Sequence, residues 1–199
     1  MIITVCSFKG GVGKTTTAIH LAAYLRGQGE TLLVDGDLNR SAKQWAAGGR
    51  LPFTVADEGQ APKLMMSGKF ASVVIDTPAR PEPEELQSLG DGCDLMVLPC
   101  SPDALAIGAL RQMVPTLKGL RAEYRVLLTL VPPKPSRAGA EAREALESVG
   151  LPLFRGEIRR LAAFQWAASQ GVTVDKTGDR MAGIAWECYR KVGKEISDG

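Results

Sequence analysis

The chain has 199 residues, of which 45% are hydrophobic and 23% are charged, and its formal net charge is +2. This composition excludes a disordered or fibrous chain, and the charge is too small to demand a nucleic-acid partner by itself. No apolar run approaches the roughly 20 residues that span a bilayer. The four cysteines have neither metal-binding nor disulfide-like spacing. The first residues, MIITV, have the character of a buried strand rather than a signal peptide, so we expect a soluble, cytoplasmic protein.

Short β-rich apolar runs alternate with helical patterns, which is typical of a parallel sheet covered by helices on both faces. Strands are predicted at residues 2–6, 31–35, 72–76, 94–99 and 125–131, with weaker ones at 51–55 and 151–155, where a proline suits an edge. Helices are predicted near residues 14–27, 39–47, 82–89, 102–118, 137–148, 158–169 and 179–196. No repeat or long linker divides the chain. We therefore expect a single domain over residues 1–199 with a doubly wound, mostly parallel α/β sheet.

The first predicted strand leads into a glycine loop, Phe8 to Thr15, with the spacing of the phosphate-binding motif G-x-x-x-x-G-K-[ST], although Phe8 replaces its opening glycine. A strand before the loop and a helix after it are required, because backbone N–H groups and a helix N-terminus must converge on phosphate oxygens. This pattern predicts a P-loop NTPase. The expected nucleotide-binding residues are Gly10, Gly11, Val12, Gly13, Lys14, Thr15 and Thr16.

Individual roles follow from the chemistry of the loop. Lys14 would contact the outer phosphates, the Thr15 hydroxyl would hold Mg²⁺, and Thr16 could reach an inner phosphate. A dinucleotide-binding loop competes for Gly11 and Gly13, with Asp35 as the acid at the end of the second strand. That reading fails because Thr16 stands at the position of its third glycine, and because such a loop has no use for Gly-Lys-Thr-Thr.

The segment KGGVGKTT, residues 9–16, resembles the deviant Walker A motif of the ParA/MinD ATPase family. The resemblance covers most of the chain and is strongest there, in LLVDGDLNRSAKQW (32–45) and in VVIDTPA (73–79). It implies an ATP-dependent homodimer in which Lys9 crosses the interface and touches the nucleotide of the other subunit. The charges agree, because added cations offset the repulsion between two triphosphates buried in one poorly hydrated cleft. Lys9 would also stabilise the transferring phosphoryl group, as an arginine finger does.

Acids after two strands complete the expected site. Asp76 closes the run SVVI and would order the water shell of Mg²⁺, with Thr77-Pro78 behind it as a switch loop. In DGDLN, the resemblance assigns the water-activating role to Asp37, so that Lys9, Lys14 and Asp37 form the catalytic set. Leu38 and Asn39 stand where many family members have proline and glutamine. The roles of Asp35 and Asn39 therefore stay open.

The residues that would bind the adenine base are harder to identify from the sequence. Family members often read the base with an asparagine after the strand that here ends in TLVPP, and Thr129 and Leu130 occupy that region. Pro99, Pro132 and Pro133 could pack on the base while backbone groups make its hydrogen bonds. The choice of ATP as nucleotide consequently follows from the resemblance.

Partition ATPases that this chain resembles bind DNA without sequence preference, through basic residues that line up in the dimer. The candidates are Arg155, Arg159, Arg160, Lys191 and Lys194. Acids are interspersed among them, so a solvated mixed surface is the alternative. The resemblance further implies a ParB-like adaptor that triggers hydrolysis, and nucleoid association in the ATP-bound state.

Three rival functions remain. A MinD-like regulator would cycle on membranes, but the apolar stripe of the last helix favours core packing over membrane binding, so no stable membrane association is expected. An electron-transfer ATPase like nitrogenase reductase would need cysteines that bridge a cluster at the dimer interface, and Cys93 and Cys100 lie too close in sequence. A metabolic ligase or kinase would need a small-molecule pocket. The lone His20 is expected to be a packing or surface residue.

Overall fold

The computed structural model describes residues 1–198, and its sheet is parallel throughout. The strand order is β3-β2-β4-β1-β5-β6, and every neighbouring pair is parallel. The strands are β1 (Ile2–Ser7), β2 (Thr31–Asp35), β3 (Thr54–Asp57), β4 (Ser72–Ala79), β5 (Leu95–Cys100) and β6 (Glu123–Leu128). The predicted doubly wound α/β fold is confirmed.

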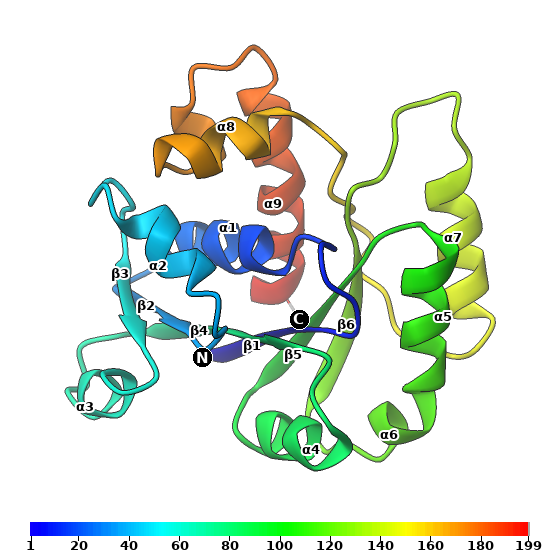
Figure 1. Ribbon diagram of the computed structural model, residues 1–199, viewed down its shortest axis with the longest axis horizontal. Coiled ribbons are helices and arrows are strands. Elements are labelled where there is room, and N and C mark those ends of the chain that lie inside the picture. Colours follow the sequence, from blue (N-terminus) through cyan, green and yellow to red (C-terminus); the bar gives the residue numbers. More distant parts are fainter. Residues whose placement is uncertain (199) are drawn as a thin grey trace.

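Helices cover both faces of the sheet, as Figure 1 shows. One face carries α1 (Lys14–Arg26), α2 (Ser41–Ala46), α8 (Ala163–Gln170) and α9 (Ala182–Ser197), with the short 3₁₀ turn η1 (Val174–Lys176) between the last two. The other carries α3 (Ala61–Met65), α4 (Pro83–Asp91), α5 (Ala104–Gln112), α6 (Val114–Lys118) and α7 (Ala138–Glu147).

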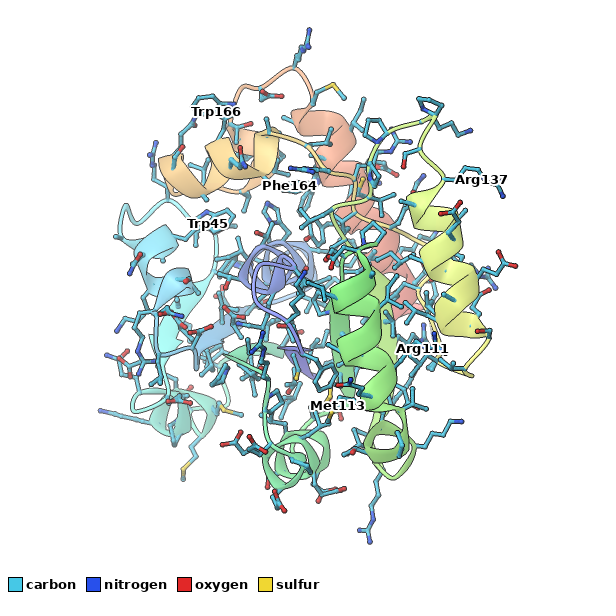
Figure 2. The ribbon with its side chains drawn as sticks, turned by 45° about the vertical axis from the view of Figure 1, so that its right-hand side comes forward. Trp45, Arg111, Met113, Arg137, Phe164 and Trp166 are labelled. Carbon is cyan, nitrogen blue, oxygen red and sulfur yellow. The ribbon has the colours of Figure 1, made fainter. Side chains whose placement is uncertain are left out.

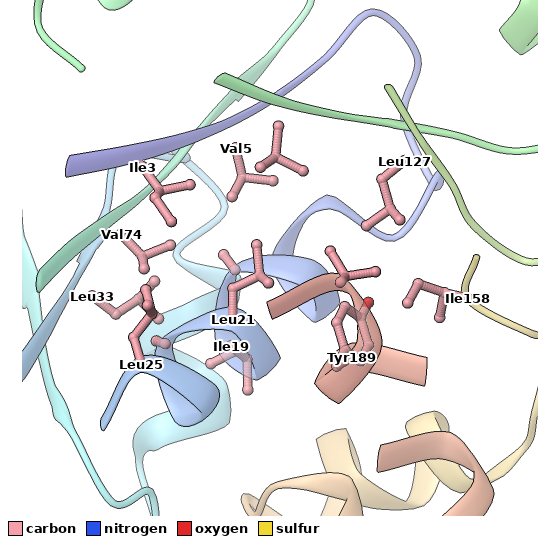
Figure 3. Close-up of a cluster of buried hydrophobic side chains, with 14 of the residues drawn as sticks. Ile3, Val5, Ile19, Leu21, Leu25, Leu33, Val74, Leu127, Ile158 and Tyr189 are labelled. Atoms are coloured by element: carbon pink, nitrogen blue, oxygen red, sulfur yellow. The ribbon is translucent and has the colours of Figure 1, made fainter. Parts of the chain in front are cut away.

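The core follows the two-residue period of the strands. Ile3 and Val5 of β1 point to the face that carries α1, where they meet Leu21 and Leu25 in the cluster of Figure 3. Cys6, one position further along β1, belongs to the cluster on the opposite face. Because α1 is packed between the sheet and α9, the loop that starts it is held by the most buried part of the molecule.

The parallel register brings the expected acids to one edge of the sheet. Asp35 is the last residue of β2 and lies opposite Asp76 in β4, and Asp76 in turn lies opposite Val5 of β1. The glycine loop leaves β1 at this same edge, as the carboxyl ends of parallel strands require.

Prolines account for two differences from the predicted elements. The helix predicted near 102–118 is two helices, α5 and α6, because Pro115 has no N–H to donate to the preceding turn and is accommodated in the first turn of a new helix. Thr77 and Pro78, predicted to form a switch loop, lie within β4, which continues past a bulge so that Ala79 pairs with Ser7.

The segment after α7 also differs from prediction. Residues 151–155 form no regular strand and touch β6 through a single bridge between Val126 and Leu153. The helix predicted near 158–169 is only α8, because residues 158–160 extend along the end of β6, where Arg160 donates to the Val131 carbonyl at 2.8 Å. The short helix α3, in APKLM, was not predicted. β3 lies three residues later than the predicted strand at 51–55 but is an edge strand as expected.

The last helix packs on the core, as predicted from its apolar stripe. Ala185, Cys188 and Val192 are buried, whereas Ile184 of the same predicted stripe is exposed. Gly193 lets α9 approach α1 closely, because the Tyr24 ring occupies the space where a side chain at 193 would begin. Among residues 1–198, no helix combines the length and the apolar character needed to cross a membrane.

Candidate functional site

The glycine loop has the conformation that a phosphate cradle needs. Gly11 and Gly13 have φ angles of 78° and 83°, a region that residues with a side chain rarely adopt. Gly13 then accepts a backbone hydrogen bond from Thr17, which starts α1. The Thr129 hydroxyl, beyond the end of β6, donates to the Val12 carbonyl at 2.7 Å and ties the loop to the far side of the sheet.

Lys14 lies at the centre of the site and is buried between two carboxylates. Its Nζ lies 2.7 Å from Asp76 Oδ1 and 3.2 Å from Asp37 Oδ2. The Thr15 hydroxyl donates to the other oxygen of Asp76 at 2.7 Å. Four of the predicted residues, from three separate segments of the chain, therefore meet within one hydrogen-bonded cluster at the carboxyl edge of the sheet.

The two carboxylates differ electrostatically. Burial raises the pKa of Asp76, and the nearby Lys14 and Thr15 oppose that shift without cancelling it. Partial burial would also raise the pKa of Asp37, but hydrogen bonds from Asn39 and Lys14 outweigh it, and the pKa is lowered. Asp37 thus stays ionised at neutral pH and is a weak base, suited to orienting a water molecule.

Asp35 and Asn39, whose roles the sequence left open, shape the loop that carries Asp37. The fully buried Asp35 carboxylate accepts from the backbone N–H groups of Asp37 (3.2 Å) and Lys43 (2.8 Å). Asn39 donates its backbone N–H and its amide group to Asp37 Oδ1, at 2.9 and 3.0 Å. Asp35 therefore fixes the start of the turn, and Asn39 orients the Asp37 carboxylate.

A magnesium ion fits this donor set. Hydroxyl and carboxylate oxygens are the ligands that Mg²⁺ prefers, and proteins usually hold it by one or two side chains together with substrate phosphates. In residues 1–198 no three His, Cys, Asp or Glu side chains cluster in a way that could hold a metal, so the protein's share would be Thr15 and, through water, Asp76. Ser7, which was not predicted as a site residue, also supports a polar ligand at this place. Its hydroxyl is buried, has no hydrogen-bond partner among the described residues, and lines the same cavity as Lys14 and Thr15.

Two adjoining cavities open around the loop. One of about 590 Å³ is lined by Lys14, Thr15, Asp37 and Ser7. A larger one of about 910 Å³ extends from Lys9 and Thr16 past Leu130 towards Leu161. Gly10, Gly11 and Gly13 line both cavities, so the loop lies between them.

The larger cavity includes part of the segment that was predicted to lie near the nucleotide base. Of the three prolines predicted to pack on the base, Pro132 lines it, whereas Pro99 lies within β5 and Pro133 is exposed outside it. Leu130 also lines it, with a left-handed backbone (φ 53°) that turns the chain out of the sheet. Pro132 therefore remains the candidate. Leu130 was placed in this region but had no predicted role, because a positive φ at leucine has no sequence signal.

The predicted DNA-binding residues fall into two groups. Arg159 and Arg160 are exposed at the wall of the larger cavity. Arg155 lies beside the C-terminal half of α9, where its backbone N–H donates to Glu195, and Lys191 and Lys194 are exposed on that helix. The five residues do not form one patch within a single chain.

His20 is a packing residue, as one of the two predicted alternatives had it, but it has polar contacts that the sequence did not show. It is fully buried, with Nδ1 2.7 Å from the Thr16 carbonyl and Nε2 accepting from Val174 N–H at 3.0 Å. Its ring stacks on Tyr189 at 4.9 Å between centroids and meets Trp45 and Phe164 edge-on. In Figure 2, Phe164 points inward from α8 and Trp166 outward. The end of the phosphate loop is thus connected to both C-terminal helices.

Comparison with known proteins gives one consistent family. Residues 3–174 match the model of the CobQ/CobB/MinD/ParA nucleotide binding domain. The maintenance of carboxysome distribution protein A of Gloeobacter kilaueensis is 35% identical over 98% of this chain and 93% of that protein. Among solved structures, the MinD cell division protein of Aquifex aeolicus superposes with a TM-score of 0.78 (16% identity, 100% of this chain, 97% of that one). The ATP complex of a Cyanothece McdA variant gives 0.73 (17% identity, 98% and 96%).

Proposed function

Because the chain belongs to the CobQ/CobB/MinD/ParA nucleotide-binding family, we propose that it is a ParA-type ATPase that distributes a cargo by cycles of ATP-dependent dimerisation. The observation that carries this proposal is the cluster in which Lys14 lies between Asp37 and Asp76, at the mouth of a glycine loop that begins with a second lysine, Lys9.

The reaction is hydrolysis of ATP to ADP and phosphate. Backbone N–H groups of residues 10–13 and the start of α1 hold the phosphates, and Lys14 moves from Asp76 onto the outer phosphate oxygens. Thr15 and, through water, Asp76 would hold Mg²⁺, which would supply positive charge against the negative charge that develops on the phosphate oxygens. Asp37, released from Lys14 but still held by Asn39, orients the attacking water in line with the terminal phosphorus. Little general-base strength is required, because the transition state of phosphoryl transfer is loose.

Dimerisation is supported by the surface around the site. Leu38 (84% exposed) and Trp166 (54%) are next in sequence to residues that line the cavities, and Leu105 (75%) lies two residues after Asp103, which lines the larger one. Each is a large apolar side chain in water. Large apolar side chains exposed beside a cavity are typical of an interaction surface. A second copy of the chain would cover them and bring its own Lys9 to the nucleotide.

The proposed cargo cycle rests on the relatives. The 35% identical relative is named for the distribution of carboxysomes, so the cargo class we propose is a large assembly such as a protein compartment, a plasmid or a chromosome. The ATP-bound dimer would bind DNA through phosphate contacts, and an adaptor on the cargo would trigger hydrolysis and release.

The test measures ATP-dependent dimerisation and hydrolysis separately from binding to DNA or to membranes. Purified protein with Mg-ATP is assayed for dimers by light scattering, for phosphate release, and for co-sedimentation with DNA or with anionic liposomes. ATP-dependent dimers that sediment with DNA support the proposal. Sedimentation with liposomes alone would favour the MinD-like membrane cycle, and a protein that binds no ATP would contradict the proposed chemistry itself.

A further inference from the structure

Among residues 1–198, only two buried side-chain groups lack a hydrogen-bond partner, and both are hydroxyls of β1. They belong to Thr4, which is fully buried, and to Ser7, which is 1% exposed. An unpaired buried hydroxyl destabilises a fold, so such groups are uncommon in native proteins. Thr4 lines neither of the two cavities around the glycine loop, whereas Ser7 lines the smaller one. The Ser7 hydroxyl therefore lies where a ligand can supply its partner.

The backbone of Ser7 is held on the side of β4. Its carbonyl accepts from the Arg80 N–H at 2.7 Å, and Ser7 pairs with Ala79 at the end of β4. The buried Thr77, two residues before Ala79, donates its hydroxyl to the Val5 carbonyl at 3.1 Å. A backbone shift that brought the Ser7 hydroxyl to another residue would break these contacts, so the hydroxyl is fixed at the start of the glycine loop.

The smaller cavity is the end of the site where the terminal phosphate would lie. Ser7 shares it with Lys14, Thr15 and Asp37, whose proposed partners are the outer phosphates, Mg²⁺ and the attacking water. The polar groups of this cavity rearrange in the proposed reaction, because Lys14 leaves Asp76 for the phosphates. Phosphate oxygens accept hydrogen bonds, whereas a serine hydroxyl can donate one, and a charged acceptor makes that bond stronger. A phosphate oxygen is therefore a partner that suits this hydroxyl.

We infer that the Ser7 hydroxyl donates a hydrogen bond to an oxygen of the terminal phosphate of ATP, and that Ser7 thereby favours ATP over ADP. This inference rests on the proposed function, because it needs a triphosphate in the smaller cavity. ADP lacks the terminal phosphate and leaves the hydroxyl unpaired. The difference between the two nucleotides is thus measured by a group that the protein itself does not satisfy.

The test compares Ser7→Ala with the wild-type protein, at protein concentrations where light scattering shows only monomers. A non-hydrolysable ATP analogue and ADP, each with Mg²⁺, compete against a fluorescent nucleotide. Because a hydrogen bond to a charged group is lost, we expect the affinity for the ATP analogue to fall by at least about 10-fold. The affinity for ADP should change by less than about twofold, because the hydroxyl has no partner in that complex.

Thermal unfolding without nucleotide shows whether the variant is intact. The midpoint should stay the same or rise, because alanine has no hydroxyl to leave unpaired. Ser7→Cys has a side chain of similar shape with a much weaker donor. It should lose affinity for the ATP analogue selectively as well, and it replaces the alanine variant should that one fold poorly.

Thr4→Val is the matched control. It removes the other buried hydroxyl of β1 that has no partner among residues 1–198, keeps a β-branched side chain, and changes a residue that lines neither cavity. Both of its nucleotide affinities should equal those of the wild type. The same change for the ATP analogue and for ADP in Ser7→Ala, or no change for either, would overturn the inference and leave the proposed function standing. A wild type that does not bind the ATP analogue would overturn both.

Discussion

The two lysines of the glycine loop lie in opposite surroundings. Lys14 is 8% exposed and bound to two acids of the same chain, Asp76 of β4 and Asp37 of the loop after β2. Lys9, five positions earlier, is 30% exposed and paired with a single acid, Asp103. Both side chains line the larger cavity. The contrast distinguishes a lysine that two acids of its own chain enclose from a lysine whose proposed target lies on a second copy.

Replacement of Lys14 is the strongest way to break this contrast. In Lys14→Ala, Asp37 and Asp76 lose their shared cation and face the phosphates as bare carboxylates. We expect ATP affinity, measured with a fluorescent analogue, to fall by at least about 30-fold. Lys43→Ala, which breaks a lysine pair outside both cavities, is the control. Unchanged ATP affinity in Lys14→Ala would refute the assignment of the loop.

Lys9→Ala tests the other half of the comparison. Because Lys9 touches neither Asp37 nor Asp76, monomer affinity for ATP should change by less than about threefold, the scale of one exposed ion pair. Dimer formation should disappear, and phosphate release should fall by about a thousandfold or more, as it does when an arginine finger is removed. A variant that dimerises and turns over normally would show that Lys9 has no role in the reaction.

Acid titration probes the link between the phosphate loop and the C-terminal helices. Burial lowers the pKa of His20 from 6.5 to about 4, against smaller opposing effects of the Thr16 carbonyl and Asp175. Below pH 6.5 the unfolded chain binds a proton at His20 that the folded protein does not bind. The free energy of unfolding therefore falls as the pH is lowered towards 4. At 1.36 kcal/mol per unit, this histidine should lower the free energy of unfolding by about 3 kcal/mol over that range.

Denaturant unfolding of the wild type and His20→Gln at several pH values isolates that contribution. The neutral glutamine has both a donor and an acceptor for the Thr16 carbonyl and the Val174 N–H. The free energy of unfolding of the wild type should therefore fall more steeply than that of His20→Gln as the pH is lowered from 6.5 to 4. Parallel curves between pH 6.5 and 4 would mean that folding does not lower the pKa of His20.

Asp35→Ala tests whether the acid next to Asp37 serves the turn. The change leaves two backbone N–H groups, of Asp37 and Lys43, without their acceptor in a buried place. We expect a loss of about 1 to 3 kcal/mol in the free energy of unfolding. Asp35→Asn, which keeps one acceptor oxygen, should lose less. Full stability of the alanine variant would contradict the structural role.

Local sequence patterns sufficed for the sheet and the phosphate loop and failed where distant segments meet. β1, β2 and β4 are recognisable because each is a short apolar run that ends in a polar turn, and the glycine loop has a fixed spacing. Residues 158–160 have helical spacing, yet they are extended because the carbonyls of Leu128, at the end of β6, and of Val131, just beyond it, accept from Ile158 and Arg160. The partner of Lys9 lies 94 residues away, and the acceptor of the Val174 N–H is a histidine 154 residues earlier. Neither contact has a signature in the sequence near it.

The smallest expected effect concerns the basic residues that the structure separates. Arg159 and Arg160 border the cavity around which the dimer would close, whereas Lys191 and Lys194 lie on the outer side of α9. Cations at the rim of a closing interface come near their counterparts on the second copy, so the arginine pair is the better candidate for a DNA contact that exists only with ATP.

Each lost phosphate contact should lower the slope of log K against log salt by about 1. We therefore expect the Arg159→Ala, Arg160→Ala double variant to lose up to about 2 units of slope with unchanged ATP affinity, and the Lys191→Ala, Lys194→Ala variant to lose less. The reverse ranking would place the DNA contact on α9, away from the proposed dimer interface. DNA binding would then not depend on dimerisation through Lys9.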